Sequence, residues 1–328
     1  MKLEEIGFSL WCDFIERDFL EKGFLELIEQ GIIKGATSNP AIFQNSFTTS
    51  SAYKDSIGAL KGQPSKKIYE ALAIQDIARA AELLAPLHAQ NPEDGWVSIE
   101  VDPLLCDDAK GSIEEGERLY QAIGHSNVMI KIPATQAGYE AMEALMAKGI
   151  SVNATLIFSL EQAKACLDAF TRGYAKSDKA PYAVISIFVS RLDRKADAKL
   201  KAAGMSEGEL GIKNAQRIYR HIQKAQLKGV RALFASTGVK GGVLPPSHYV
   251  DRLLHAHSVN TAPLETIKAF VKEGNPTPQP IPSLEEEERF WAEVQRAGVE
   301  MEALCDELLS EGLALFKESF TSLLASLK

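Results

Sequence analysis

The amino-acid sequence predicts an α/β fold in which eight parallel strands close into a (β/α)8 barrel. Eight short apolar or β-branched runs alternate with segments of helical period along the 328 residues. No G-x-G-x-x-G motif follows an early run, which disfavours the alternative, an open doubly wound sheet. Polar residues recur toward the ends of several runs, which is where a barrel of the TIM type builds its site.

The first four expected strands lie in the N-terminal half of the chain. Each is a short apolar or β-branched run, and the fourth, VMIKIP, is closed by a proline. Their ranges are 8–14, 33–39, 96–102 and 128–133. More than one helix's worth of chain separates the second strand from the third, so we expect extra helices between them.

The last four expected strands have the same character, and their ranges are 150–158, 183–190, 231–237 and 258–263. Segments of helical period flank the fifth strand. One helix is expected over 138–149, where Gly149 ends it, and another over 159–176. The second begins with Ser159 as N-cap and has Gln162 three residues later, which is a capping-box pattern.

The chain from about residue 283 is also expected to be helical. It follows the proline-rich loop GNPTPQPIP at 274–282, which separates it from the last strand. We expect this segment to pack on the barrel as a C-terminal helical cap rather than to fold alone. Residues 1–328 are therefore expected to form one domain, with 283–328 as a helical extension.

Composition and charge narrow the classes of function. Hydrophobic residues make up 45% of the chain and charged residues 24%, which is ordinary for a globular protein. The net charge of −8 disfavours a nucleic-acid partner, because non-specific binding needs an extended basic surface. The acidic N-terminal stretch does not resemble a secretory signal, and no run approaches the roughly 18 apolar residues of a membrane helix. We therefore expect a cytoplasmic protein that has no membrane partner.

The sequence also disfavours metal chemistry and Ser–His–Asp hydrolysis. The cysteines (Cys12, Cys106, Cys166 and Cys305) are scattered, which is typical of a reducing compartment. His255 and His257 are two apart, so on a helix they would not share a face, and no H-E-x-x-H motif is present. No G-x-S-x-G elbow is present either. We therefore expect neither a metal nor an organic cofactor.

A lysine stands inside one of the most apolar strands. Lys131 lies between Ile130 and Ile132 in NVMIKIPAT, and lysine is seldom buried without a partner because it loses its hydration. It could extend past the last layer of the barrel and reach water, or it could be held inside for chemistry. An amine nucleophile near carboxylates is the equipment for Schiff-base chemistry on a carbonyl substrate.

Polar residues of other strands share the alternating parity that directs side chains to one face. Because they cluster toward strand ends, a barrel would collect them around one cavity. This set comprises Asp13, Thr37, Asn39, Ser98, Glu100, Asp102, Asn153, Thr155, Ser186 and Ser190, with the apolar Phe188 at the same parity as Ser186.

Most of these residues have structural alternatives that the sequence leaves open. Asp13 could cap the following helix or pair with Arg17, and Glu100 could belong to a structural ion pair. Asn39 precedes a proline, which is a common turn arrangement. The hydroxyls of Thr155 and Ser186 could simply bond to backbone groups of the strands.

Seven stretches of the chain, in this order, resemble the transaldolase family, in its longer bacterial form. They are SLWCDFIERDFLEKG, IKGATSNPAIF, NVMIKIPAT, GISVNATLIFS, ISIFVSRLD, FASTGVK and VNTAP. The resemblance runs nearly from end to end, and the T-S-N-P-x-I-F and I-K-I-P-A-T signatures are highly specific.

The resemblance implies a role for most members of the polar set. Lys131 matches the lysine that forms an imine with the ketose substrate, and Asp13 matches the acid–base aspartate of the first strand. Glu100 and Thr155 match residues that move the remaining protons. The residues that match those holding the dihydroxyacetone hydroxyls are Asn39, Asn153 and Ser186, and Thr37 and Phe188 are expected to line the same substrate site.

The resemblance also implies a phosphate site, with one departure from the family pattern. Arg191 matches the family arginine after F-V-x-R, and Ser236 matches the serine that ends the seventh strand. Many transaldolases place a second phosphate-binding arginine two residues later, where this chain has Gly238. Lys240 is the residue expected to replace it, as a point charge instead of a bidentate fork.

The activity implied is that of the pentose phosphate pathway enzyme. A dihydroxyacetone unit would pass from sedoheptulose 7-phosphate or fructose 6-phosphate to glyceraldehyde 3-phosphate or erythrose 4-phosphate, in a monomer or a homodimer. One alternative is fructose-6-phosphate aldolase, a shorter relative that carries tyrosine at the position of Phe188 and lacks a glutamate at that of Glu100. Another is a catalytically silent barrel that binds sugar phosphates.

Overall fold

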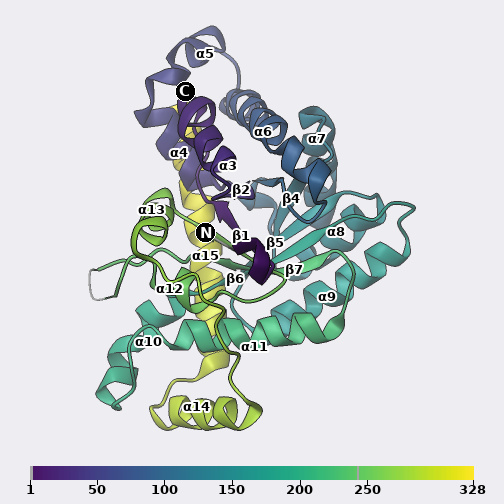
Figure 1. Ribbon diagram of the computed structural model, residues 1–328. Coiled ribbons are helices and arrows are strands. Elements are labelled where there is room, and N and C mark those ends of the chain that lie inside the picture. The colour runs from purple at the N-terminus through teal and green to yellow at the C-terminus, as the bar shows by residue number, and fades with distance from the viewer. Residues whose placement is uncertain (1–2, 242–243) are drawn as a thin grey trace.

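The eight expected strands are all present and close into a barrel. The computed structural model describes residues 3–241 and 244–328. The strands are parallel, follow one another in chain order around the barrel, and β1 pairs with β8 to close it (Figure 1). They are β1 (Phe8–Cys12), β2 (Gly35–Thr37), β3 (Trp96–Glu100), β4 (Val128–Pro133), β5 (Ser151–Ile157), β6 (Ala183–Phe188), β7 (Val230–Ala235) and β8 (Ser258–Ala262). The (β/α)8 prediction is confirmed.

Helices surround this barrel, and the expected extra helices lie between β2 and β3. The helices of the first half are α1 (Leu3–Ile6), α2 (Arg17–Phe19), η1 (Leu20–Phe24), α3 (Leu25–Glu29), α4 (Pro40–Thr49), η2 (Ser51–Tyr53), α5 (Lys54–Ala59), α6 (Ser65–Gln90), η3 (Pro103–Leu105), α7 (Ala109–Ile123) and α8 (Gln136–Ala147). Those of the second half are α9 (Leu160–Ala175), α10 (Ser190–Ala202), α11 (Leu210–Ala225), α12 (His248–Arg252), α13 (Leu264–Glu273), α14 (Leu284–Arg296) and α15 (Met301–Ser326).

The two helices that the sequence marked around β5 are also confirmed. Helix α9 begins with the expected capping box, in which the Ser159 hydroxyl accepts from the Gln162 amide at 3.1 Å. The Gln162 side-chain oxygen in turn accepts from the Ser159 amide at 3.0 Å. These two bonds satisfy backbone donors that the first turn of a helix leaves without partners.

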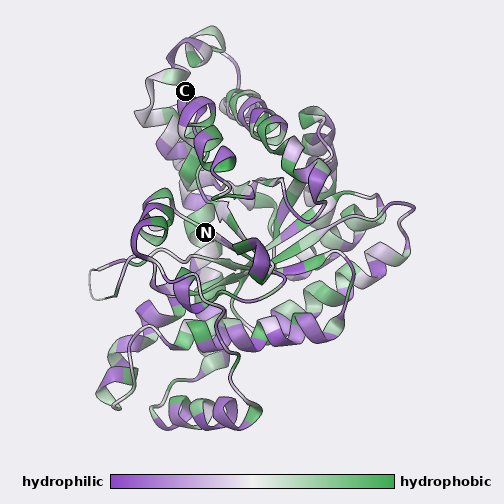
Figure 2. Ribbon diagram, in the orientation of Figure 1, coloured by the Kyte–Doolittle hydropathy of each residue, from purple (hydrophilic) through white to green (hydrophobic). Residues whose placement is uncertain are grey.

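Apolar side chains fill the space between the strands and the helices. One buried cluster joins outward-facing strand residues such as Leu10, Ile130 and Ala154 to the inner faces of the helices. Figure 2 shows the helices striped in purple and green, as expected when one face meets the core and the other meets water. This layer anchors each strand and so determines which residues turn into the barrel.

The inside of the barrel is packed and is not a pore. Trp11, Trp96, Met129 and Leu233 belong to a second buried cluster inside it. The large indole of Trp11 fits because Gly35 on the neighbouring strand has no side chain, and a Cβ there would lie 2.6 Å from the Trp11 ring. These residues form the floor on which the polar residues above them rest.

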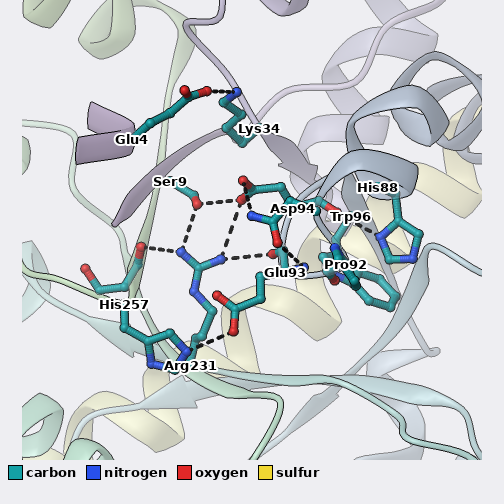
Figure 3. A network of polar contacts seen from close by, with 12 residues as sticks. Glu4, Ser9, Lys34, His88, Pro92, Glu93, Asp94, Trp96, Arg231 and His257 are labelled. Carbon is teal, nitrogen blue, oxygen red and sulfur yellow. Dashed lines mark hydrogen bonds and ion pairs between the residues drawn. The ribbon is translucent and has the colours of Figure 1, made fainter. Parts of the chain in front are cut away.

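A polar network fills the N-terminal end of the barrel (Figure 3). Arg231 of β7, only 4% exposed, donates to the Ser9 hydroxyl and the Ser258 carbonyl, both at 2.8 Å. It also donates to the Glu93 carbonyl at 2.9 Å and lies 3.6 Å from an Asp94 carboxylate oxygen. The Ser9 hydroxyl donates to Asp94 at 2.6 Å. This network ties β1, β7, β8 and the segment before β3 together.

The C-terminal segment is helical, as expected, and its last helix crosses the barrel. Figure 1 shows α15 as a long yellow helix that runs from the side of α10 to the side of α4, and it contacts both of them and β5. Gly312 allows the close approach, because a Cβ there would lie 2.9 Å from the Leu156 side chain and 3.3 Å from an Arg191 guanidinium nitrogen. Helix α15 therefore meets the C-terminal ends of the strands. Over the described residues, no helix is both long and apolar enough to cross a membrane.

Candidate functional site

A cavity of about 200 Å³ lies at the C-terminal ends of the strands. Of the residues that the family resemblance assigns to the site, all but two line it: Asp13, Thr37, Asn39, Lys131, Thr155, Ser186, Phe188, Arg191, Ser236 and Lys240. The two exceptions, Glu100 and Asn153, are buried against this group, as described below. A larger cavity, of about 760 Å³, lies against α14 and is lined by none of these residues. The chemistry of the lining, rather than volume, therefore identifies the candidate site.

Lys131 lies inside the barrel at the base of this cavity. The strand register places it directly between Glu100 of β3 and Asn153 of β5. Lys131 is only 6% exposed, so the alternative in which it reaches bulk water is wrong. Its ammonium nitrogen donates to the Ser38 carbonyl at 3.1 Å and lies 3.8 Å from a Glu100 carboxylate oxygen. The amine thus faces a substrate-sized space with one carboxylate beside it.

Glu100 is buried beside Lys131 without other polar partners. Among the described residues, neither of its carboxylate oxygens has a hydrogen-bond partner, although the nearest charge, Lys131, is only 3.8 Å away. Burial raises the pKa of Glu100 to about 7, against the opposing effect of Lys131, and Asp13 adds to the rise. A carboxyl group that titrates near neutral pH can both donate and accept a proton there.

Asp13, the residue that follows β1, also faces Lys131. Its carboxylate accepts from the Thr37 hydroxyl at 2.6 Å, and the Thr37 hydroxyl oxygen lies 2.6 Å from that of Thr261. Burial raises the pKa of Asp13, while the charge of Lys131 and the bond from Thr37 oppose the rise. A raised pKa means that the folded site favours protonated Asp13 more than water does.

The structural alternatives for Asp13 are wrong. Glu16, not Asp13, caps α2 and accepts from the Phe19 amide at 2.7 Å. Arg17 pairs with Asp76 at 3.1 Å, and neither of them lines the cavity.

We expect the buried Glu100 carboxyl to make stability depend on pH. Its pKa is about 7 in the folded chain against an ordinary value of 4.5, so below pH 4.5 it is protonated in both folded and unfolded chains. Between these values the unfolded chain loses the proton and the folded chain keeps it. The free energy of unfolding should therefore fall as pH rises, by at most about 1.4 kcal/mol per pH unit.

Glu100→Gln should remove this dependence, because the amide does not titrate. Urea unfolding of both proteins at several pH values between 4.5 and 7 would measure it. The wild-type curve should fall more steeply with pH than that of the variant. Parallel curves would contradict the raised pKa.

A network of amide and hydroxyl groups lies on the other side of Lys131. The Asn153 side-chain oxygen accepts from the Ser186 hydroxyl at 2.6 Å, and its amide nitrogen donates to the Ser98 hydroxyl at 3.1 Å. The Thr155 hydroxyl is buried and, among the described residues, has no partner. The alternative in which Thr155 and Ser186 bond to backbone is therefore wrong.

An irregularity in β5 aims its residues into the site. The register with β6 shifts between Ala154 and Ile157, and Leu156 has a left-handed backbone with φ of 59°. Such bulges bend a strand and redirect side chains. Here Thr155 lines the cavity, while Leu156 joins the interior cluster beside Gly312.

Asn39 caps a helix and also lines the cavity. Its side-chain oxygen accepts from the Ile42 amide at 3.0 Å and caps α4, with Pro40 at the first helical position. Asn39 therefore has a structural role, as a helix N-cap with extended backbone rather than in a turn, and it also lines the cavity. Asp102, by contrast, lies away from the cavity lining and pairs with Lys66 at 2.7 Å, so its parity with Glu100 was misleading.

Basic groups gather at one side of the cavity mouth. The Arg191 guanidinium lies over the Phe188 ring, 5.0 Å from its centroid. Burial lowers the pKa of Arg191, and the nearby charge of Arg194 lowers it further. The Ser236 hydroxyl lies 3.1 Å from that of Ser190. Lys240 lines the same mouth and is exposed.

The lining also contains residues that were not proposed from the sequence, and the polar or aromatic ones among them are Arg194, Thr261 and Phe316. Thr261 lies at the end of β8, so the strand-end rule that selected the other polar residues would have found it. Arg194 follows Arg191 by about one helical turn in SRLDR, a weaker signal. Phe316 comes from α15, and its ring centroid lies 6.0 Å from the Lys131 nitrogen. No local pattern in the sequence marks it.

Metal ligands are not grouped within the described residues. No cluster of three or more histidine, cysteine, aspartate or glutamate side chains that could hold an ion occurs there. The buried reactive groups that the site does bring together are one amine, two carboxyl groups and several hydroxyls.

Known proteins resemble this chain over nearly its whole length. The family described as Transaldolase/Fructose-6-phosphate aldolase matches residues 10–327. A transaldolase of Campylobacter jejuni subsp. jejuni (strain 81-176) is 48% identical over 334 residues, covering 98% of this chain and 99% of that protein. A transaldolase of Helicobacter pylori (strain Shi470) is 44% identical over 319 residues, covering 97% and 99%. The chain belongs to the transaldolase/fructose-6-phosphate aldolase family.

Proposed function

We propose that this chain is a transaldolase that moves a dihydroxyacetone unit between phosphorylated sugars through an imine on Lys131. The single observation that carries the proposal is the placement of the Lys131 amine. It is buried, lies 3.8 Å from Glu100, and lines a cavity whose walls also include Asp13. The names of relatives that are 44% and 48% identical over nearly the full length support the same activity.

The first step forms the imine. Lys131 passes a proton to the Glu100 carboxylate, 3.8 Å away, and its free amine attacks the C2 carbonyl of fructose 6-phosphate or sedoheptulose 7-phosphate. The resulting carbinolamine must lose its hydroxyl group as water. Glu100, with a pKa of about 7, supplies the proton for this loss, and the Thr155 hydroxyl is free to relay it. The product is an iminium that can accept an electron pair from the carbon chain.

The second step breaks the C3–C4 bond. Asp13 removes the proton of the C4 hydroxyl, the bonding electrons pass to the iminium, and the aldose phosphate leaves. The remaining three-carbon enamine is held by hydrogen bonds from Asn39, Asn153 and Ser186. An acceptor, glyceraldehyde 3-phosphate or erythrose 4-phosphate, then reacts in the reverse sense, and Asp13 returns the proton.

The residues that would surround the enamine favour transfer of the dihydroxyacetone unit over its release as free dihydroxyacetone. Phe188 is 6% exposed, and its ring is covered by Arg191. It has no hydroxyl with which to protonate the intermediate or to direct water toward it. Fructose-6-phosphate aldolase activity, the second activity named for the family, is therefore the weaker candidate.

Borohydride reduction tests the proposal. Incubation with fructose 6-phosphate and borohydride should add the mass of one reduced dihydroxyacetone unit, and peptide mapping should place it on Lys131. No added mass, as a silent sugar-binding barrel would give, or a mass on another residue, would contradict the imine. Appreciable free dihydroxyacetone from fructose 6-phosphate alone would indicate the aldolase instead. The cytoplasmic location and the monomeric or homodimeric state remain predictions.

A further inference from the structure

The side of the cavity mouth that would receive the substrate phosphate contains a second arginine. Arg191 and Arg194 both line the cavity, on the first turns of α10. The position after β7 where many transaldolases carry an arginine is Gly238, which also lines the cavity and offers no charge. We propose that Arg194 is the second phosphate-binding cation of this chain, in the place expected for Lys240. This inference rests on the proposed function and names its phosphate contact.

Arg194 is connected to the residues expected at the phosphate. Its guanidinium donates to the Ser190 hydroxyl at 3.2 Å, and that hydroxyl lies 3.1 Å from the hydroxyl of Ser236. Ser190 is 3% exposed and its amide donates to the Ser236 carbonyl at 3.1 Å, so this connection is part of the barrel rim. A phosphate near Ser236 would therefore lie within the range of the Arg194 fork.

Two like charges lie together here, and the carboxylate that acts on Arg191, that of Glu311, is already paired with Lys195. Within residues 3–241 and 244–328, neither Arg191 nor Arg194 makes an ion pair, whereas Arg17, Arg118 and Arg252 all do. Adjacent cations repel each other, and a bound anion would relieve that repulsion. Arginine also suits a phosphate better than lysine does, because its fork can make two parallel hydrogen bonds.

Arg194 and Lys240 differ in how firmly the backbone holds them. Arg194 is exposed at the rim, but its backbone is held in the 13-residue helix α10. Lys240 is also exposed, and it lies in a segment without regular structure that has Gly238 and Gly241 on either side. A cation on a rigid element loses less conformational freedom when it grips a ligand, which favours Arg194.

The test compares acceptors with and without a phosphate, at saturating fructose 6-phosphate. Arg194→Gln should raise the KM for erythrose 4-phosphate about tenfold, the lower end expected for a charge-assisted hydrogen bond at an exposed rim. It should leave the KM for unphosphorylated glyceraldehyde unchanged. The inhibition constant of inorganic phosphate should rise by a similar factor, and Arg194→Lys should restore part of the loss.

Lys195→Gln is the matched control. It removes one positive charge from the same helix, but Lys195 is exposed and bonds to Glu307 and Glu311 on α15. It should leave both acceptors and phosphate inhibition unchanged. Equal losses for the two acceptors in Arg194→Gln, or a larger loss in Lys240→Gln, would overturn the assignment. Failure of the proposed function would show differently, as a wild-type chain that gives no borohydride adduct.

Discussion

Replacing Lys131 with methionine is expected to lower transaldolase turnover by at least about a thousandfold, the scale on which covalent catalysis fails without its nucleophile. The thioether occupies a similar volume but cannot form an imine. The variant should also acquire no mass from fructose 6-phosphate and borohydride. Turnover in a coupled assay and intact-protein mass spectrometry would measure the two effects.

The Lys131→Met chain should remain folded. Methionine suits the surrounding apolar strand, and burial already favours protonated, uncharged Glu100 and Asp13, so loss of the ammonium leaves them a neutral form to adopt. Lys164→Met, on the exposed face of α9, is the control and should be fully active. Substantial turnover by Lys131→Met, or an adduct on it, would refute the role of this amine.

Replacing Arg231 with methionine is expected to lower the free energy of unfolding by about 3–5 kcal/mol, the usual result of removing one partner from a buried ionic network. The change would leave the Ser258 and Glu93 carbonyls without this donor and Asp94 without its buried cation (Figure 3). Urea unfolding monitored by circular dichroism would measure it.

Arg79→Met is the matched control for this substitution. Arg79 pairs with Glu21 and Glu82 on the exposed surface, where an ion pair contributes at most about 1 kcal/mol. The turnover per folded Arg231→Met molecule should be close to that of wild type, because Arg231 lies at the end of the barrel opposite the cavity. A loss below about 1 kcal/mol would show that the network is dispensable.

The sequence alone was sufficient to predict the barrel. Each strand is a short apolar run. Successive side chains of a strand point to opposite faces, and this alternation depends on the strand itself, not on distant parts of the chain. Because barrel sites gather at strand ends, the same pattern also selected Lys131, Asp13 and Glu100 before any contact between them was known. The rule failed for Asp102, because its carboxylate pairs with Lys66 of α6.

The tertiary structure alone decided how these groups act on one another. Burial, not residue type, raises the pKa of Glu100 to about 7, and it does so because no hydrogen-bond donor within the described residues reaches its oxygens. Phe316 and the close approach at Gly312 depend on where α15 docks, far along the chain from the strands it meets. Local patterns determine which elements form and which face they bury, whereas distances between residues remote in sequence are set by packing of the whole chain.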